Sequence, residues 1–369
     1  MNLEALRHNL RVVRRHAGGA RVWAVLKADA YGHGAPAVAR TLERARVDGF
    51  CVALLEEAVE LREAGIAAPI LVMGGYYGSA HEEVLARNLV PVVHDLGQIA
   101  AFARLVRTGA APGPIDVHLK IDTGMARLGV TMGALPALAA RLGEHPEVRI
   151  AGLMTHLACA DESGTEETTE QMVRFDEATT LLVRRGVRPQ MRHAANSAAL
   201  LRAQARLDAV RPGIAVFGVA PLVDGAPLVG DLRPVMRVRT EVVAVRDVEP
   251  GGAAGYGATW RARRPSRVAT IPMGYADGLS RQLGNRGSVL VRGGRAPIVG
   301  AVSMDMTMID VTDVPGADVR DEVVVLGSQD GPLGRGAIGA DEIAAQSGTI
   351  AWEVLTSVSR RVPRFYREP

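Results

Sequence analysis

Short apolar segments alternate with amphipathic segments along the first part of the chain. Apolar residues recur at helical spacing between Leu3 and Val13, which predicts that the chain opens on a helix. Further helical patterns cover residues 56–65, 99–109 and 169–186. Eight strand-like apolar segments are interleaved with helical ones, at 21–28, 49–54, 69–75, 90–95, 115–122, 148–158, 190–197 and 207–218. Eight βα units favour an α/β fold with a closed (β/α)8 TIM-like barrel, and a doubly wound open sheet is the alternative.

After about residue 231 the pattern changes to the two-residue alternation of strands. Segments such as "RVRTEVVAVRDV", "VATIPMG" and "DEVVVLG" lie between Gly- and Pro-rich turns, and helical patterns are scarce until about residue 340. We therefore predict two domains. A (β/α)8 barrel covers residues 1–231, and a mainly β C-terminal domain covers residues 232–369.

Composition and charge narrow the classes of function. The 369 residues are 48% hydrophobic, which is enough for a sizeable core. The net charge is only +3, the arginines are scattered and aromatic residues make up 4%, which argues against nucleic-acid binding. No apolar run is long enough to span a membrane, and the segment "MNLEALRHNLRVVRR" lacks the apolar stretch of a signal peptide. Cys51 and Cys159 lie in apolar segments as expected of buried thiols, and we expect a cytoplasmic protein.

The chain contains only two lysines, Lys27 and Lys120, among 43 cationic residues. Lys27 follows the apolar residues "WAVL", so its stem should be partly buried. Burial lowers the pKa of an amine and makes it a usable nucleophile, whereas arginine does not deprotonate. A lysine kept in an arginine-rich chain therefore suggests a Schiff base, and chance retention is the alternative.

Barrel active sites lie at the carboxyl ends of the strands. The polar residues that follow the apolar segments are Lys27, Lys120, Asp122, His156, His193, Asn196, Ser197 and Arg211. Each of these alone has an ordinary structural alternative, such as a hydrogen-bonded histidine or a turn arginine. Backbone N–H groups near Gly213, together with Ser197, could hold a phosphate. Combined with a Schiff-base lysine on the first strand, this suggests pyridoxal 5'-phosphate (PLP).

Nine blocks of the sequence resemble the alanine racemase family, in the same order and over essentially the whole chain. They are "AVLKADAYGHG", "HLKIDTGMARLG", "THLACAD", "HAANSAAL", "VRPGIAVFG", "GYGATW", "IPMGYADGLSR", "VGAVSMDM" and "GTIAWEV". The resemblance implies a PLP-dependent isomerase that interconverts L- and D-alanine, supplies D-alanine for peptidoglycan of the cell wall, needs no metal, and forms a homodimer with composite active sites.

The resemblance also implies roles for single residues. Lys27 would hold PLP and act as one base, while Tyr256 of the partner subunit would act as the second base on the opposite face. Met304 and Asp305 of the partner subunit would bind the substrate side. The other implied roles are these: Tyr31, Ser197, Gly213 and Ile214 around the phosphate, Asn196 in contact with the cofactor, His156 beside the ring, Arg211 at the pyridine nitrogen with His193 supporting it, Arg127 at the PLP phenolic oxygen and the substrate carboxylate, and a carbamylated Lys120 that positions Arg127.

Two of these positions carry a chemical argument of their own. Arg211 stays cationic and can only donate, so it disfavours protonation of the pyridine nitrogen and thereby proton return to the cofactor. An acidic group would be expected there in a decarboxylase of related fold. A carbamate forms on an amine and not on a guanidinium, which suits Lys120. An ordinary ion pair of Lys120 with Asp122 is the alternative.

The sequence departs from the family pattern at two positions. Trp352 stands where the family usually has tyrosine, and Ala301 stands where arginine is common. A racemase of broader or different specificity, for example for serine, therefore stays open. A non-catalytic PLP carrier is the further alternative, although such carriers lack the β domain that contains Tyr256.

Overall fold

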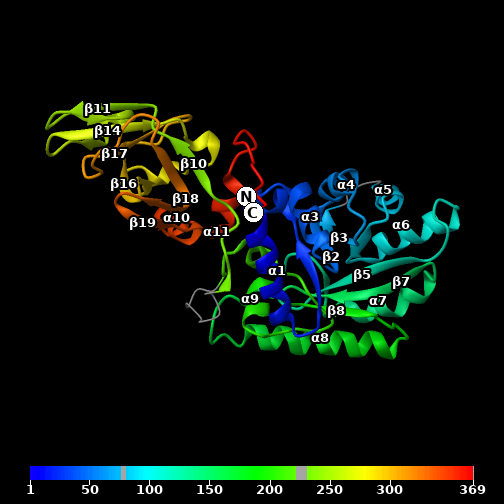
Figure 1. Cartoon of the computed structure of the whole chain (residues 1–369). Coiled ribbons are helices and arrows are strands. Elements are labelled where there is room, and N and C mark those ends of the chain that lie inside the picture. The colour runs from blue at the N-terminus through cyan, green and yellow to red at the C-terminus, as the bar shows by residue number, and fades with distance from the viewer. Residues whose placement is uncertain (76–79, 222–230, 369) are drawn as a thin grey trace. The chain divides into compact units, whose positions relative to one another are not determined.

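The computed structural model describes residues 1–75, 80–221 and 231–368 (Figure 1). The chain divides into two compact units. The barrel unit comprises residues 5–30 and 35–233, and the β unit comprises residues 1–4, 31–34 and 234–369.

The barrel unit is built on eight parallel strands, which Figure 1 colours from blue to green. Their bounds are β1 (Arg21–Val25), β2 (Gly49–Leu54), β3 (Ile70–Gly75), β4 (Val90–Val93), β5 (Ile115–Asp122), β7 (Val148–Met154), β8 (Met191–His193) and β9 (Ala209–Val210). Neighbouring strands pair in this order, and β9 pairs with β1, so the sheet closes on itself. The closed barrel is confirmed and the open sheet is wrong. A short strand, β6 (Val130–Thr131), pairs with β5.

Helices follow the strands as the alternating pattern predicted. They are α1 (Leu3–Ala17), α2 (Lys27–Gly32), α3 (Ala35–Arg44), α4 (Leu55–Glu63), α5 (His81–Ala86), α6 (Leu96–Arg107), α7 (Leu135–Arg141), η1 (Leu142–Glu144), α8 (Glu167–Arg184), α9 (Ser197–Leu201) and η2 (Ile214–Phe217). Helix α6 begins three residues before the predicted start. Its N-cap, Asp95, accepts a hydrogen bond from the Gln98 N–H at 2.9 Å, which satisfies one of the free donors of the first turn.

The last two barrel strands are much shorter than the apolar segments that predicted them. After β8, Asn196 caps helix α9 by accepting a hydrogen bond from the Ala199 N–H at 3.0 Å, so the chain leaves the sheet. After β9, Pro212 has no N–H to donate to a neighbouring strand. The chain therefore turns into η2 at this point, and polar side chains gather where both strands end.

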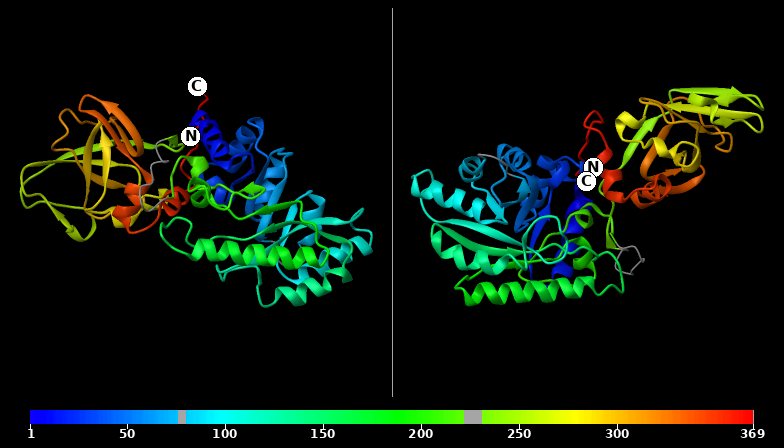
Figure 2. Two further views of the ribbon diagram at one scale, coloured as in Figure 1. Left: turned by 90° about the horizontal axis from the view of Figure 1, so that it is seen from below. Right: turned by 180° about the vertical axis from the view of Figure 1, so that it is seen from behind.

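The β unit consists mainly of antiparallel strands, drawn in yellow-green to orange in Figure 2. Its strands are β10 (Val238–Glu241), β11 (Ala244–Val248), β12 (Ala253–Ala254), β13 (Trp260–Arg261), β14 (Ser266–Ile271), β15 (Ser288–Val291), β16 (Gly294–Val299), β17 (Thr307–Asp310), β18 (Glu322–Gly331) and β19 (Gly334–Ile338). Its helices are η4 (Tyr256–Ala258), η5 (Tyr275–Asp277), η6 (Arg281–Leu283), α10 (Ala340–Ser347) and α11 (Ala351–Ser357). The main sheet has the order β10-β18-β15-β16-β17-β14-β11, and the predicted β character is confirmed.

Segment 31–34 belongs to the β unit because contacts with the end of the chain hold it there. The Arg364 guanidinium donates hydrogen bonds of 3.3 and 3.2 Å to the Gly32 carbonyl. The Tyr366 hydroxyl donates to the His33 carbonyl at 3.2 Å. A Cβ on Gly34 would lie 1.8 Å from that hydroxyl, so this close approach requires glycine.

Burial follows the architecture of each unit. Strand β2 begins with four consecutive buried residues, as expected for a parallel strand covered on both faces. Phe50, Phe102 and Phe175 are among the largest fully buried side chains of the barrel unit. Cys51 is buried as predicted, whereas Cys159 is only partly buried because it lies beyond the end of β7. No helix among the described residues is long and apolar enough to cross a membrane.

Candidate active site

The carboxyl ends of the barrel strands bring together most of the polar residues that the sequence singled out. Lys27 follows β1, Lys120 lies near the end of β5, His156 follows β7, His193 ends β8 and Arg211 follows β9. The positive charges of Arg211, Lys120 and Lys27 all act on the pKa of His156. These side chains therefore form one electrostatically coupled cluster inside a single unit.

Lys27 is a partly buried amine at the end of β1. Loss of hydration and the nearby positive charge of Arg127 lower the pKa of Lys27, while the Glu57 carboxylate opposes that change. A lowered pKa raises the fraction of free amine, which is the nucleophilic form. The prediction that burial makes Lys27 a usable nucleophile thus has a physical basis here.

Helix α2 begins at Lys27, and the four residues directly after Lys27 form a left-handed turn. Residues Ala28, Asp29, Ala30 and Tyr31 have φ values of 53°, 54°, 52° and 54°. Each left-handed non-glycine residue costs about 1–2 kcal/mol, so surrounding contacts must hold the turn. The Asp29 carboxylate accepts the Ala35 N–H at 2.7 Å, and the Ala30 N–H bonds to the Leu26 carbonyl at 2.9 Å. Sequence reasoning missed this turn because four non-glycine residues give no local sign of positive φ.

Lys120 is the second amine of the cluster and is only 6% exposed. Burial, with the positive charges of Arg127, Arg211 and Lys27, lowers the pKa of Lys120 to about 8, although the Asp122 carboxylate opposes the change. An oxygen of Asp122 instead accepts the N–H groups of Gly124 and Ala126, at 3.1 and 3.0 Å. Asp122 therefore shapes the loop that carries the exposed Arg127.

Arg211 is buried and its guanidinium is held at three points. It donates to Nδ1 of His193 at 2.7 Å, and it donates to the carbonyl oxygens of Thr155 and Ala194 at 2.7 and 3.2 Å. Burial lowers the pKa of Arg211 to about 10, so the side chain keeps its charge near neutral pH. The side chain is thus fixed as a cationic donor at the end of β9.

His118 extends this arrangement, and sequence reasoning missed it. Its Nδ1 lies 2.8 Å from Nε2 of His193. Burial and the charge of Arg211 lower the pKa of His118 to about 4. His118 and Lys120 are two residues apart in β5, so their side chains point to the same face. That spacing is the sequence signal that could have identified it.

Ser197 and Gly213 connect the ends of β8 and β9. The Ser197 hydroxyl oxygen accepts the N–H groups of Gly213 and Ala215, at 2.8 and 3.3 Å. Ile214 begins η2 directly beside them, and the first N–H groups of a helix have no partner within it. The Gly213 and Ala215 N–H groups are thus used by Ser197, and the Asn196 side-chain oxygen is used as the cap of α9, while the Ser197 hydroxyl keeps its own proton to donate.

His156 is held by a buried glutamine that the sequence analysis did not identify. Gln171 donates to the His156 carbonyl at 3.0 Å and accepts the Ala158 N–H at 2.8 Å. Loss of hydration and the surrounding positive charges lower the pKa of His156 to about 3. The ring is therefore a neutral imidazole at neutral pH.

The remaining predicted residues lie in the β unit. Tyr256 begins η4 between two glycines with positive φ and is 74% exposed. Met304 is 52% exposed. Asp305 accepts a 2.6 Å hydrogen bond from Arg361, which also contacts Asp277 at 2.6 Å. Tyr31 is buried in the same unit.

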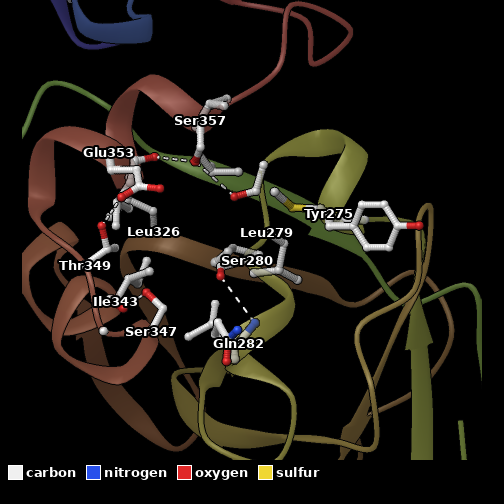
Figure 3. Close-up of a pocket in the computed structure, with 18 residues that line it drawn as sticks. Tyr275, Leu279, Ser280, Gln282, Leu326, Ile343, Ser347, Thr349, Glu353 and Ser357 are labelled. Carbon is white, nitrogen blue, oxygen red and sulfur yellow. Dashed lines mark hydrogen bonds between the residues drawn. The ribbon is translucent and has the colours of Figure 1, made fainter. Parts of the chain in front are cut away.

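The β unit also contains a cavity of about 360 Å³ that none of the predicted site residues lines (Figure 3). Among its lining residues are Leu279, Ser280, Leu326, Ser347 and Glu353. Its serine hydroxyls are used within the protein; for example, Ser347 donates to the Ile343 carbonyl at 2.6 Å. Among the described residues, no group of His, Cys, Asp and Glu side chains is arranged to hold a metal ion.

Comparisons with known proteins agree over the whole chain. The family profile for the alanine racemase N-terminal domain matches residues 1–221, and that for the C-terminal domain matches residues 235–366. An alanine racemase from Sorangium cellulosum is 63% identical over 376 residues, which covers 100% of this chain and 98% of that protein.

Solved structures are similar over the same length. The crystal structure of the biosynthetic alanine racemase from Pseudomonas aeruginosa has a TM-score of 0.88 at 39% identity, covering 100% of this chain and 98% of that one. The structure of alanine racemase from Bartonella henselae with covalently bound pyridoxal phosphate has a TM-score of 0.89 at 29% identity, with the same coverage.

Proposed function

The chain belongs to the alanine racemase family of PLP-dependent enzymes, and from that premise we propose how its residues interconvert L- and D-alanine. The clustering of two amines, an imidazole and a buried arginine at the strand ends of the barrel unit is the observation that carries the proposal. We assign residues 1–231 to the PLP-binding domain and residues 232–369 to the C-terminal domain.

The side chains at the strand ends fit PLP chemically. Lys27 is an amine with a lowered pKa, which suits it to react with the aldehyde of PLP. The Ser197 hydroxyl lies at the start of η2, beside Gly213 and Ile214, and this proximity supports a phosphate site formed by these three residues. Bound PLP supplies electron withdrawal from the Cα–H bond of the amino acid. Tyr31 would complete the phosphate site, Asn196 would contact the cofactor, and the neutral His156 ring would lie beside it.

Lys27 has two proposed tasks. It holds the cofactor through its amine, and it moves a proton on one face of the substrate Cα. Removal on one face and return on the other requires a second base on the opposite face, and we assign that role to Tyr256. The exposure of Tyr256 on the β unit supports this role, because such a side chain is free to enter a site in another subunit.

Arg211 would donate to the pyridine nitrogen and keep that nitrogen unprotonated. Its contact with His193 supports the predicted role of that histidine in orienting the guanidinium. With less charge delocalised into the ring, proton return to Cα is favoured over proton return to the cofactor. This arrangement would suppress transamination.

Arg127 would hold the substrate carboxylate and the phenolic oxygen of PLP. Its positive charge lowers the pKa of Lys120, which supports the proximity of these two side chains. Carbamylation would convert Lys120 into an anion, and the anion would then hold Arg127 in place.

A homodimer is part of the proposal because Tyr256, Met304 and Asp305 would each enter the site of the partner subunit. The exposure of Tyr256 and Met304 supports this arrangement. The enzyme would act in the cytoplasm and supply D-alanine for peptidoglycan.

The experiment that tests the function is a panel of L-amino acids, each incubated with the purified enzyme and assayed for the D-enantiomer. We expect D-alanine to be the principal product. A larger yield of D-serine than of D-alanine would identify serine as the preferred substrate. Trp352 and Ala301 would then be the first residues to test as determinants of specificity. Absence of any D-amino acid would contradict the proposal.

A further inference from the structure

A carboxylate outside the predicted site holds the backbone next to Lys27. One oxygen of Glu57 accepts the Ala28 N–H at 2.6 Å. The other oxygen accepts the N–H groups of Ala53 and Leu54, at 2.8 and 3.0 Å. One side chain thus ties Ala28, the first residue of the left-handed turn, to the end of β2.

The contacts with Ala53 and Leu54 have a familiar explanation. Glu57 is the third residue of helix α4, and a glutamate at this position commonly accepts the N–H of the N-cap residue, here Leu54. The contact with Ala28 goes beyond that role because Ala28 lies on another strand–helix connection. It is also the residue that follows Lys27 in the chain.

The chemistry of this contact requires a carboxylate. All three backbone partners are donors, and an ionised carboxylate has two accepting oxygens. A glutamine would have to turn its amide NH2 toward at least one of these N–H groups. The substitution Glu57→Gln therefore removes the negative charge and breaks one side of the connection, while it preserves the size of the side chain.

We propose that Glu57 is a positioning residue that fixes the left-handed turn after Lys27 and thereby aims the Lys27 amine into the site. The proposal rests on the role assigned above to Lys27. It adds a residue from α4 that acts through the backbone next to Lys27.

The negative charge of Glu57 also affects the pKa of Lys27, in addition to the hydrogen bonds that Glu57 accepts. Burial and Arg127 lower the pKa of Lys27, and the negative charge of Glu57 limits that decrease. Removal of the charge should therefore lower the pKa of Lys27 further. A carboxylate that contacted α4 alone and lay away from Lys27 would not change this pKa.

The chain offers a matched control in Glu43. This glutamate also accepts two backbone N–H groups, those of Ala67 and Ala68, both at 2.8 Å. Glu43 is partly buried in the same unit, as Glu57 is. Glu43→Gln therefore reproduces the loss of a backbone-bound carboxylate without a contact near Lys27.

The test uses the full-length chain freed of PLP by hydroxylamine and labelled with 13C at the lysine side chains. With only two lysines, the signals of Lys27 and Lys120 are assigned from Lys27→Arg and Lys120→Arg. We expect Glu57→Gln to lower the pKa of Lys27, and Glu43→Gln to leave it unchanged. In the PLP-loaded enzyme we expect kcat/KM to fall by about 100-fold in Glu57→Gln, because a misplaced reacting group costs about that factor.

The proposal is overturned if the pKa of Lys27 is the same in Glu57→Gln as in the wild type, or if both glutamine variants lose activity equally. Should Glu57→Gln fail to fold, Glu57→Asp decides, since it keeps the charge but is one methylene shorter. Loss of kcat/KM in a folded Glu57→Asp supports the proposal, and wild-type kinetics overturn it. Borohydride reduction and peptide mapping test Lys27 separately: PLP found on Lys120 would refute the proposed function, while the titration would still decide the role of Glu57.

Discussion

The Nη1 group of Arg211 donates a 2.7 Å hydrogen bond to Nδ1 of His193. Because arginine has donors only, Nδ1 of His193 must accept. Burial and the charge of Arg211 keep the pKa of His193 well below its ordinary value, so the ring is neutral and carries its proton on Nε2. That proton is donated to Nδ1 of His118 at 2.8 Å. The cation at the end of β9 thus fixes the tautomers of two buried histidines.

Gly152 makes room for this chain of hydrogen bonds. A Cβ at this position would lie 2.5 Å from three atoms of the His118 ring. We expect Gly152→Ala to lower the free energy of unfolding by about 1–3 kcal/mol, as overpacking of a core does. Activity should fall as well, because displacement of His118 disturbs His193 and Arg211. Urea denaturation and steady-state kinetics measure the two effects.

Gly133→Ala is the control for this substitution because a Cβ there meets nothing within 4 Å. Wild-type stability in Gly152→Ala would show that β5 and β7 accommodate the methyl group without moving the histidine.

The buried histidines predict a loss of stability in acid. The pKa of His118 is about 4 in the folded chain, because of burial and the charge of Arg211, against 6.5 when unperturbed. Between these values the unfolded chain binds the proton and the folded chain does not. Stability is therefore present above about pH 6.5 and decreases as the pH falls toward 4, by roughly 3 kcal/mol for this group.

Denaturation by urea at about pH 7 and about pH 4.5 measures that loss. His118→Gln, which does not titrate, should lose less stability between the two pH values than the wild type. An equal loss in both proteins would show that other groups cause the acid sensitivity.

Lys120 should react with carbon dioxide near neutral pH. Its pKa, lowered to about 8 by burial and by the charges of Arg127 and Arg211, leaves part of the amine unprotonated there. Enzyme equilibrated with 13C-bicarbonate should show a carbamate carbon in its NMR spectrum. Lys120→Arg should lose this signal, and Lys27→Arg should keep it. A carbamate signal that persists in Lys120→Arg would contradict the assignment.

Tyr256 is predicted to act in the site of the partner subunit. Lys27→Ala and Tyr256→Phe should each be inactive or nearly so in at least one direction of racemisation. When the two variants are expressed together, activity should return. A hybrid dimer then contains one site in which both Lys27 and Tyr256 are intact. Random pairing restores roughly a quarter of the wild-type sites. No recovery in verified hybrid dimers would place Tyr256 in the site of its own subunit.

Much of the barrel was predictable from the sequence alone. Each predicted strand segment contains an observed strand, because buried parallel strands leave apolar runs between helical repeats. The polar residues at the carboxyl ends of the barrel strands were also predictable. Lys27, His156, His193 and Arg211 all stand where the apolar segments end. The two lysines drew attention for a chemical reason, as only an amine can form an imine or a carbamate.

Other features depended on contacts between distant parts of the chain. Glu57 in "LLEEAVEL" looks like an ordinary residue of an amphipathic helix, and its bond to Ala28 exists only because β1 and β2 lie side by side. His118 gained its role from His193, 75 residues away in sequence. The left-handed turn after Lys27 is imposed on residues that favour the right-handed helix, so it had no local signature.

The amino-acid sequence by itself therefore determined which chemistry is available and on which strands it is placed. The tertiary structure decided how that chemistry is oriented and tuned. Hydrogen-bond partners, tautomers and pKa values arise from burial and from neighbours brought together by the closed sheet, and neither burial depth nor long-range proximity is encoded in any short stretch of the chain.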